Sequence, residues 1–137
     1  MIVLDTSLLS HVFRRPPARQ AESEVVAHFR TLVREGHVLA IPGVVMQELL
    51  SGVRDQSQFE RLQLSLEGFP LILAEEADHV EAARLMNLVR RGGITSSSFD
   101  MLIAATTIRR DAHLFTLDRD FEMLAGQVPL KLLKRPA

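Results

Sequence analysis

Apolar residues follow two patterns along this chain: short continuous runs, and stripes spaced three or four residues apart. Ile2 to Leu4 is a continuous run that ends at Asp5, which is typical of a strand buried on both faces with a polar residue at its carboxyl end. Further short runs predict strands at 38–41, 71–73, 114–116 and near 130–133.

Helical stripes separate these runs. Residues 22–35 carry apolar side chains at 25, 26, 29, 32 and 33 and stop at Gly36, and residues 76–91 carry a second stripe that stops at Gly92 and Gly93. Weaker signals predict a short helix from Ser7, helices at 44–52, 56–66 and 99–110, a short helix near Phe121, a loop at 14–19 and a capped loop at 95–98.

Strands that alternate with helices predict an α/β fold with a parallel sheet, because parallel neighbours need crossover connections. We therefore expect helices on both faces of that sheet. The chain has 137 residues, 47% of them hydrophobic, and we expect one compact domain over residues 1–137.

The composition excludes several classes of protein. The chain has no cysteine, so it has neither a disulfide framework nor a thiolate zinc site, and a reducing, cytoplasmic setting is expected. The N-terminus has no basic stretch, and the longest apolar run, 38–46, is broken by Pro42 and Gly43, which argues against export or membrane spanning.

The net charge of −1 argues against a protein that binds nucleic acid merely by being basic. Setting aside the four acids discussed next leaves 13 acidic residues against 16 basic ones. All but Lys131 and Lys134 of the basic residues are arginine, the better bidentate partner for phosphate. Codon bias with a solvated surface explains these arginines equally well.

Four acids are predicted to meet at one edge of the sheet. Asp5 ends the first strand, and Asp118 follows the strand at 114–116. Asp100 lies in the first turn of its helix, and Glu48 lies one turn into another. Ligands of open α/β sheets collect at the carboxyl ends of the strands, so this edge is the candidate site.

Each acid also has a structural interpretation. Asp5 is suited to cap the short helix that follows it. Asp100 favours the helix dipole and stands three residues after Ser97 in a box-like pattern. Asp118 and Asp120 are typical turn residues.

Glu48 is harder to explain structurally, because its helix is expected to be apolar almost all round, and a carboxylate carried there needs a partner. The remaining chemistry is sparse. The five histidines lack metal-ligand spacing, and the chain has neither a glycine-rich phosphate loop nor a Gly-x-Ser-x-Gly nucleophile motif.

Four stretches resemble the PIN-domain nucleases and, within them, the VapC-type toxins of bacterial toxin–antitoxin pairs. They are Met-Ile-Val-Leu-Asp-Thr-Ser at 1–7, Met-Gln-Glu-Leu-Leu-Ser-Gly at 46–52, Phe-Asp-Met-Leu-Ile-Ala-Ala at 99–105 and Leu-Phe-Thr-Leu-Asp-Arg-Asp-Phe at 114–121. Each stretch alone is weak, but their order and spacing together are specific. The resemblance implies a three-layer α/β/α sandwich, an endoribonuclease activity on RNA, a homodimer and a VapB-type antitoxin whose tail covers the acidic pocket.

The resemblance also implies the site residues. These are Asp5, Glu48, Asp100 and Asp118, with Thr6 and Thr116 as candidate accessory hydroxyls and Asp120 as a substitute for Asp118. Asp118 is preferred because the family's fourth acid stands two residues after the threonine.

Clustered carboxylates are the ligands that Mg²⁺ or Mn²⁺ prefers. We expect Asp5 and Asp100 to bind such an ion directly, Asp118 to bind it directly or through water, and Glu48 to orient water there. Whether one ion or two bind stays open. Arginines at 14, 15, 90, 91 and 119 are candidates for contacts with the RNA backbone.

Two other function classes remain as alternatives. An aspartyl-phosphate phosphatase would use Asp5 as its nucleophile, but such enzymes usually need a second aspartate two residues on, where this chain has Ser7, and a downstream lysine. Both lysines lie within the last seven residues. A non-catalytic binding module is the second alternative, and four intact acids argue against it.

Overall fold

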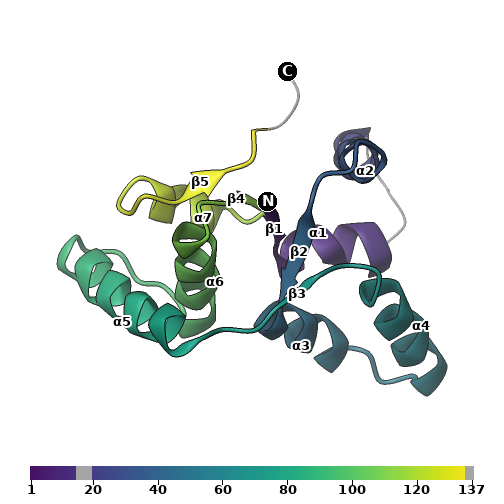
Figure 1. Cartoon of the computed structure of the whole chain (residues 1–137), viewed down its shortest axis with the longest axis horizontal. Helices are drawn as coiled ribbons and strands as arrows, with labels where there is room; N and C mark the ends of the chain where they lie inside the picture. Colours follow the sequence, from purple (N-terminus) through teal and green to yellow (C-terminus); the bar gives the residue numbers. More distant parts are fainter. Residues whose placement is uncertain (15–19, 135–137) are drawn as a thin grey trace.

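The computed structural model describes residues 1–14 and 20–134, and its centre is a five-stranded parallel sheet (Figure 1). The strand order is β3-β2-β1-β4-β5. The strands are β1 (Ile2–Leu4), β2 (Leu39–Pro42), β3 (Leu71–Ile72), β4 (His113–Phe115) and β5 (Lys131–Leu132). This confirms the predicted parallel α/β fold.

Seven α-helices connect the strands within the described residues. Two of them, α4 and α5, have the predicted bounds, and the others differ from the prediction by a few residues at their ends. The helices are α1 (Thr6–Leu9), α2 (Gln20–Arg34), α3 (Gly43–Ser51), α4 (Gln56–Leu66), α5 (Glu76–Arg91), α6 (Ser98–Arg109) and α7 (Arg119–Ala125). Of the loop predicted at 14–19, residues 15–19 lie outside the described residues.

The region after Asp5 differs from the prediction. The short helix α1 begins at Thr6 and continues as a five-residue π-helix, η1 (Ser10–Arg14). No apolar spacing in this short segment distinguishes a π-helical turn from an α-helical one, so the sequence did not predict it.

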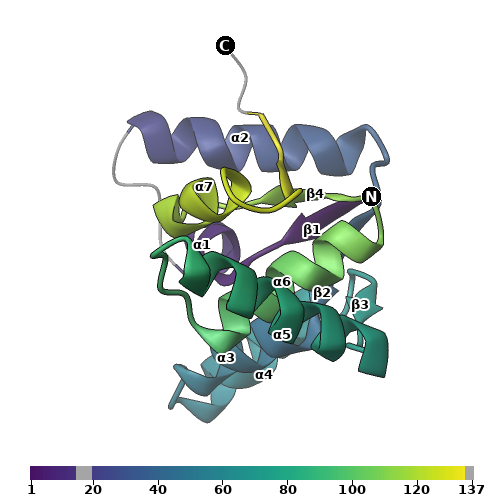
Figure 2. The same ribbon diagram turned by 90° about the vertical axis from the view of Figure 1, so that its left-hand side faces the viewer.

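Helices cover both sides of the sheet (Figures 1 and 2). Helices α5 and α6 lie on one side of β1, β2 and β3, and α1, α3 and α4 lie on the other (Figure 1). All three residues of β1 are buried, as are residues 101–107 of α6, which explains the near-continuous apolar character of both segments. No helix in the described part of the chain is long and apolar enough to cross a membrane.

A buried ion pair joins α5 to α6. The Asp78 side chain is fully buried, and it accepts hydrogen bonds from Arg110 at 2.9 and 3.1 Å and from Arg109 at 2.7 Å. Burial alone would raise the pKa of Asp78, but these bonds, the Glu75 backbone contact and the arginine charge hold it well below its ordinary range. The carboxylate therefore stays charged and fixes the packing of the two helices.

The strand order places the candidate acids. Strand β1 pairs in parallel with β4, with Leu4 opposite Phe115. The residues that follow, Asp5 and Thr116, therefore leave the sheet side by side at its carboxyl edge. Strand β2 flanks β1 on the other side and leads into α3, which carries Glu48. Crossovers that diverge from a central strand in this way open the crevice in which α/β proteins bind ligands.

Candidate active site

Asp5 is almost fully buried, with 3% of its surface exposed, and the surrounding structure satisfies its carboxylate. Its Oδ1 accepts a hydrogen bond from the Leu8 amide at 3.1 Å, so Asp5 caps α1. The Ser7 hydroxyl lies 2.8 Å from Oδ1 and 3.0 Å from Oδ2, and the Thr116 hydroxyl lies 2.5 Å from Oδ2. Thr116, which the sequence offers as an accessory hydroxyl, is thus in direct contact with Asp5.

Asp118 follows β4 and caps α7. Its Oδ1 accepts a hydrogen bond from the Asp120 amide at 2.9 Å, and its own amide donates to the Thr116 hydroxyl at 3.0 Å. The short segment from Thr116 to Asp118 is thereby tied to Asp5 through the threonine hydroxyl.

Three carboxylates lie close together in front of this segment. Asp100, Asp118 and Asp120 each offer an oxygen, and these oxygens lie within 4.8 Å of one another. Asp100 and Asp118 are half-buried and Asp120 is exposed. We call these three residues the acidic trio. Both Asp118 and Asp120, which the sequence offered as alternatives, belong to it.

The charges of the acids act on one another. Burial raises the pKa of Asp5, and the charge of Asp118 adds to that rise against the hydrogen bonds from Thr116, Leu8 and Ser7. Partial burial likewise raises the pKa of Asp100, and the charges of Asp118, Glu48 and Asp120 raise it further. Asp118 therefore lies within electrostatic reach of both Asp5 and Asp100, and Glu48 and Asp120 lie within electrostatic reach of Asp100.

Glu48 has a different environment from the one predicted. Helix α3 buries only Val45 and Leu49, and Glu48 is exposed rather than enclosed by apolar side chains. The prediction was wrong because only the side of the helix with Val45 and Leu49 packs into the core, and Glu48 lies on the exposed side with Gln47. Its Oε1 accepts a hydrogen bond from the Thr6 hydroxyl at 3.4 Å, so Thr6 joins α3 to the turn that carries Asp5.

The structural interpretations of the acids are compatible with a binding role. Asp5 and Asp118 cap helices, and Asp100 lies in the first turn of α6, where its amide donates to the Ser97 hydroxyl at 3.1 Å. A capping bond uses one of about four acceptor positions on a carboxylate, so each side chain keeps oxygen lone pairs for a cation.

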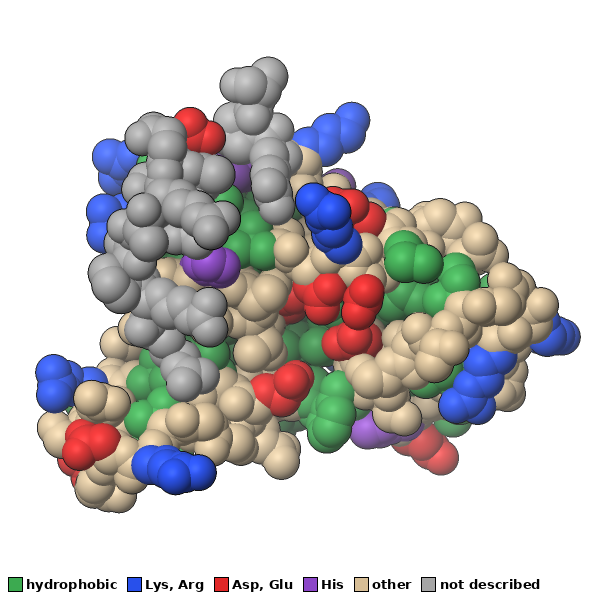
Figure 3. Space-filling model, turned by 180° about the vertical axis from the view of Figure 1, so that it is seen from behind, with side chains coloured by type: hydrophobic (Ala, Val, Ile, Leu, Met, Phe, Trp, Pro, Cys, Tyr) green, Lys and Arg blue, Asp and Glu red, His purple; other side chains and the backbone are tan. Residues whose placement is uncertain are grey.

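The acids open onto a hollow face of the molecule. Figure 3 shows acidic side chains gathered at the centre of that face. A cavity of about 390 Å³ adjoins them, lined by the loop at 93–97, Asp100, Asp120, Met123 and Leu124. A phosphate group with its neighbouring sugar can enter a cavity of this size.

The arginines proposed for RNA contacts are partly described. Arg90, Arg91 and Arg119 are exposed, and none of them forms an ion pair with another residue in the described part of the chain. Arg15 lies outside the described residues, and the side chain of Arg14 is likewise not described.

Sequence reasoning missed Ser7 as a site residue. It assigned Ser7 only to the start of a short helix, whereas its hydroxyl contacts both Asp5 and the segment after β4. A hydroxyl two residues after a carboxylate at a strand end is the signal that would have pointed to it.

Comparison with known proteins gives one family. The family model described as PIN domain matches residues 2–127. VapC ribonuclease Mb1587 of Mycobacterium bovis and ribonuclease VapC11 of Mycobacterium tuberculosis are each 33% identical to the chain over 127 residues, which cover 91% of this chain and 92% of each relative.

Solved structures share the fold at lower identity. FitAcB from Neisseria gonorrhoeae superposes with a TM-score of 0.80 at 22% identity over 98% of both chains. VapBC2 from Rickettsia felis, bound to a promoter DNA fragment, superposes with a TM-score of 0.79 at 20% identity, over 97% of this chain and 98% of that chain. VapC20 of M. tuberculosis, a toxin that cleaves the sarcin–ricin loop, superposes with a TM-score of 0.65 at 15% identity, over 95% of this chain and 98% of that chain.

Proposed function

This chain belongs to the PIN domain family, and from that premise we propose that it is a VapC-type endoribonuclease, the toxin of a toxin–antitoxin pair, with its active site at Asp5, Glu48, Asp100 and Asp118. The named ribonucleases that align with it over nine-tenths of its length support the activity. The observation that supports the site is the acidic trio, which lies at the crevice of a parallel sheet beside the buried Asp5.

The donor set suits a hard divalent cation, Mg²⁺ or Mn²⁺. Its members are carboxylates that repel one another, and no lysine or arginine forms an ion pair with them among the described residues. Such repulsion is relieved by a cation. Asp100 and Asp118 would hold it, and Asp120 would contribute directly or through water.

Asp5 also keeps a ligand position. Its carboxylate accepts hydrogen bonds from three donors: the Leu8 amide, the Ser7 hydroxyl and the Thr116 hydroxyl. With the serine proton on the nearer Oδ1, that oxygen has two donors and Oδ2 has one. One lone pair of Oδ2 is then free to bind the cation.

When bound, the cation would supply a lowered pKa for the attacking water and charge stabilisation for the scissile phosphate. The residues of the chain prepare this chemistry. Asp5 and Asp118 are held by their hydrogen bonds, and Glu48, which is exposed and bonded to Thr6, would orient the attacking water and accept its proton. The exposed arginines, such as Arg119, would hold neighbouring phosphates of the RNA.

The partner of a VapC-type toxin is a VapB-type antitoxin. Similar folds occur in a structure described as a toxin–antitoxin complex from Klebsiella pneumoniae, 20% identical with a TM-score of 0.71, and in VapBC complexes. We propose that the antitoxin's tail covers the acidic pocket, whose hollow face is open in the isolated chain (Figure 3).

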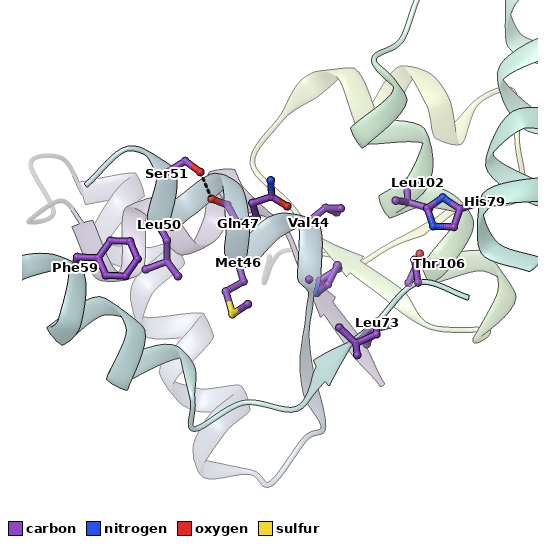
Figure 4. A pocket seen from close by; sticks show the side chains of 14 residues that line it. Val44, Met46, Gln47, Leu50, Ser51, Phe59, Leu73, His79, Leu102 and Thr106 are labelled. Atoms are coloured by element: carbon purple, nitrogen blue, oxygen red, sulfur yellow. Dashed lines mark hydrogen bonds between the residues drawn. The ribbon is translucent and has the colours of Figure 1, made fainter. Parts of the chain in front are cut away.

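We also propose a homodimer through the edge of the sheet at β3. Leu71 and Leu73 are exposed there by 46% and 68%, and an adjoining groove of about 650 Å³ runs between α3 and α6. Figure 4 shows Met46 and Leu50 of α3 on one side of this groove and Leu102 on the other. An unpaired edge strand with exposed apolar residues is a surface that proteins normally cover.

RNA cleavage tests the proposed function directly. The purified protein should cut single-stranded RNA with Mg²⁺ or Mn²⁺ and stop when EDTA is added. Asp100→Asn should lower the rate by orders of magnitude, whereas Asp111→Asn, a surface change at a left-handed position that asparagine tolerates, should leave it unchanged. Undiminished cleavage in EDTA would refute the metal mechanism, and release of phosphate from small phosphoesters without RNA cleavage would indicate the phosphatase instead.

A further inference from the structure

Ser7 joins two parts of the site that lie far apart in the sequence. Its hydroxyl lies 2.8 Å from Oδ1 of Asp5 and accepts a hydrogen bond from the Leu117 amide at 3.0 Å. Ser7 is half-buried in the first turn of α1, and Leu117 lies 110 positions later, in the segment between β4 and α7. The serine therefore bridges the turn after β1 and the turn after β4.

Counting protons fixes the direction of these bonds. A hydroxyl has one proton to donate, and an ionised carboxylate can only accept. The Leu117 amide donates a hydrogen bond to the Ser7 oxygen, so the Ser7 hydroxyl is left to donate its own hydrogen bond to Asp5. The Asp118 amide likewise donates a hydrogen bond to the Thr116 hydroxyl, and that hydroxyl donates a hydrogen bond to Oδ2 of Asp5. The two hydroxyls lie 3.3 Å apart, and this count leaves no proton for a bond between them.

Two consecutive amides are thus linked to one carboxylate through two parallel hydroxyls. Removal of one hydroxyl would leave the Thr116 to Asp118 segment held on one side only. The backbone of that segment carries Asp118, a member of the acidic trio. The distance between Asp5 and Asp118 therefore depends on both hydroxyls.

We propose that Ser7 is a positioning residue of the active site, which holds the segment that carries Asp118 in place beside Asp5, so that Asp118 can bind a divalent cation together with the rest of the acidic trio. This inference rests on the proposed function for its effect on metal and RNA. Its structural part, the clamp between Ser7 and Leu117, is independent of that function. Residues that orient metal ligands in this way commonly change metal affinity by about 10- to 100-fold when they are removed.

Amide hydrogen exchange in metal-free protein tests the clamp. In Ser7→Ala the Leu117 amide loses its acceptor, and it should exchange at least about tenfold faster than in the wild type. Ser7→Thr, which keeps the hydroxyl, should restore protection. Ser57→Ala, an exposed serine change on α4, serves as the matched control and should leave Leu117 unchanged. Wild-type protection of Leu117 in Ser7→Ala would overturn the clamp.

Calorimetric titration with Mn²⁺ tests the positioning role. Ser7→Ala should bind Mn²⁺ about 10- to 100-fold more weakly than the wild type, and Ser7→Thr should recover most of the affinity. Equal affinities in Ser7→Ala and the wild type would overturn the proposal even if amide exchange changed. If Ser7→Ala does not fold, Ser7→Cys, a near-isosteric weak donor, takes its place in both measurements.

The two proposals fail in different ways. A wild-type chain that neither binds Mn²⁺ nor cuts RNA would refute the proposed function. In that case the exchange of the Leu117 amide alone decides whether Ser7 holds the segment, and wild-type protection in Ser7→Ala would still overturn the clamp.

Discussion

The hydroxyl oxygen of Thr116 lies 2.5 Å from Oδ2 of Asp5, although 111 positions separate the two residues in the chain. The parallel pairing of β1 with β4 brings them together, because Leu4 and Phe115 are opposite each other and the next residue on each strand leaves the sheet at the same edge. The Thr116 hydroxyl also accepts a hydrogen bond from the Asp118 amide, so it links the buried Asp5 to the acidic trio.

Removal of this hydroxyl should impair catalysis more than folding. Thr116→Val keeps the shape of the side chain but leaves Oδ2 of Asp5 and the Asp118 amide without their partner, and we expect kcat to fall by about 10- to 100-fold. Thr116→Ser keeps the hydroxyl and should retain most of the activity. Steady-state cleavage of a labelled RNA measures the difference, and equal rates in Thr116→Val and the wild type would show that the contact has no catalytic role.

The two acids of the trio that follow β4 should not contribute equally. The charge of Asp118 raises the pKa of both Asp5 and Asp100, and it raises the pKa of Asp100 more than the charge of Asp120 does. Asp118→Asn should therefore cost more activity and more Mn²⁺ affinity than Asp120→Asn. The opposite order, in parallel cleavage assays, would make Asp120 the main ligand.

The stability of the metal-free protein should depend on pH in two opposite ways. The raised pKa values of Asp5 and Asp100 mean that the native chain binds more protons than the unfolded chain, so stability falls as the pH climbs from 3.8 through those values. The lowered pKa of Asp78 has the reverse effect, and its contribution is lost as the pH drops below 3.8.

Urea unfolding in EDTA at a series of pH values measures both slopes. Asp78→Asn should reduce the loss of stability on the acid side and leave the loss above pH 3.8 in place. A free energy of unfolding that rises steadily from pH 4 to pH 7 would show that the acids of the site do not repel one another.

The exposed edge at β3 should govern the oligomeric state. Leu73→Glu places a charge on a side chain that is 68% exposed in the isolated chain, so it should leave the fold intact and convert a dimer to a monomer. Sedimentation velocity measures this, and Leu64→Glu, at a similarly exposed leucine of α4, is the matched control. A monomeric wild type would exclude the dimer. A dimeric Leu73→Glu variant would place the interface elsewhere.

Much of the fold follows from local patterns. The stripe at 76–91 and the run at 2–4 predict α5 and β1 because each has a single periodicity and clear stop signals. The π-helix at Ser10–Arg14 and the burial of Asp78 with its arginine partners were not predicted. The π-helix has no distinguishing apolar spacing, and the ion pair of Asp78 joins residues about 30 positions apart, which local spacing does not encode.

The site was predictable in its members and less so in its details. Strand ends and the family resemblance identify Asp5, Asp100 and Asp118, and the charge of Asp118 acts on both of the others in the structure. The exposure of Glu48 depends on how tightly neighbouring helices pack, and the clamp at Ser7 depends on the register of β1 with β4. Neither quantity can be derived from the residues alone.

Thermal melts of the wild type and Asp100→Asn, each in EDTA and in saturating Mn²⁺ at pH 7, test the central claim that these acids form a metal site. At about a hundred times its dissociation constant, Mn²⁺ should stabilise the wild type by roughly 2.7 kcal/mol, a shift of several degrees. Asp100→Asn should be more stable than the wild type in EDTA, because a repelled charge is gone, and should gain much less from Mn²⁺. An Asp100→Asn protein that is less stable than the wild type in EDTA, with the same gain from Mn²⁺, would contradict the account and make Asp100 a structural residue.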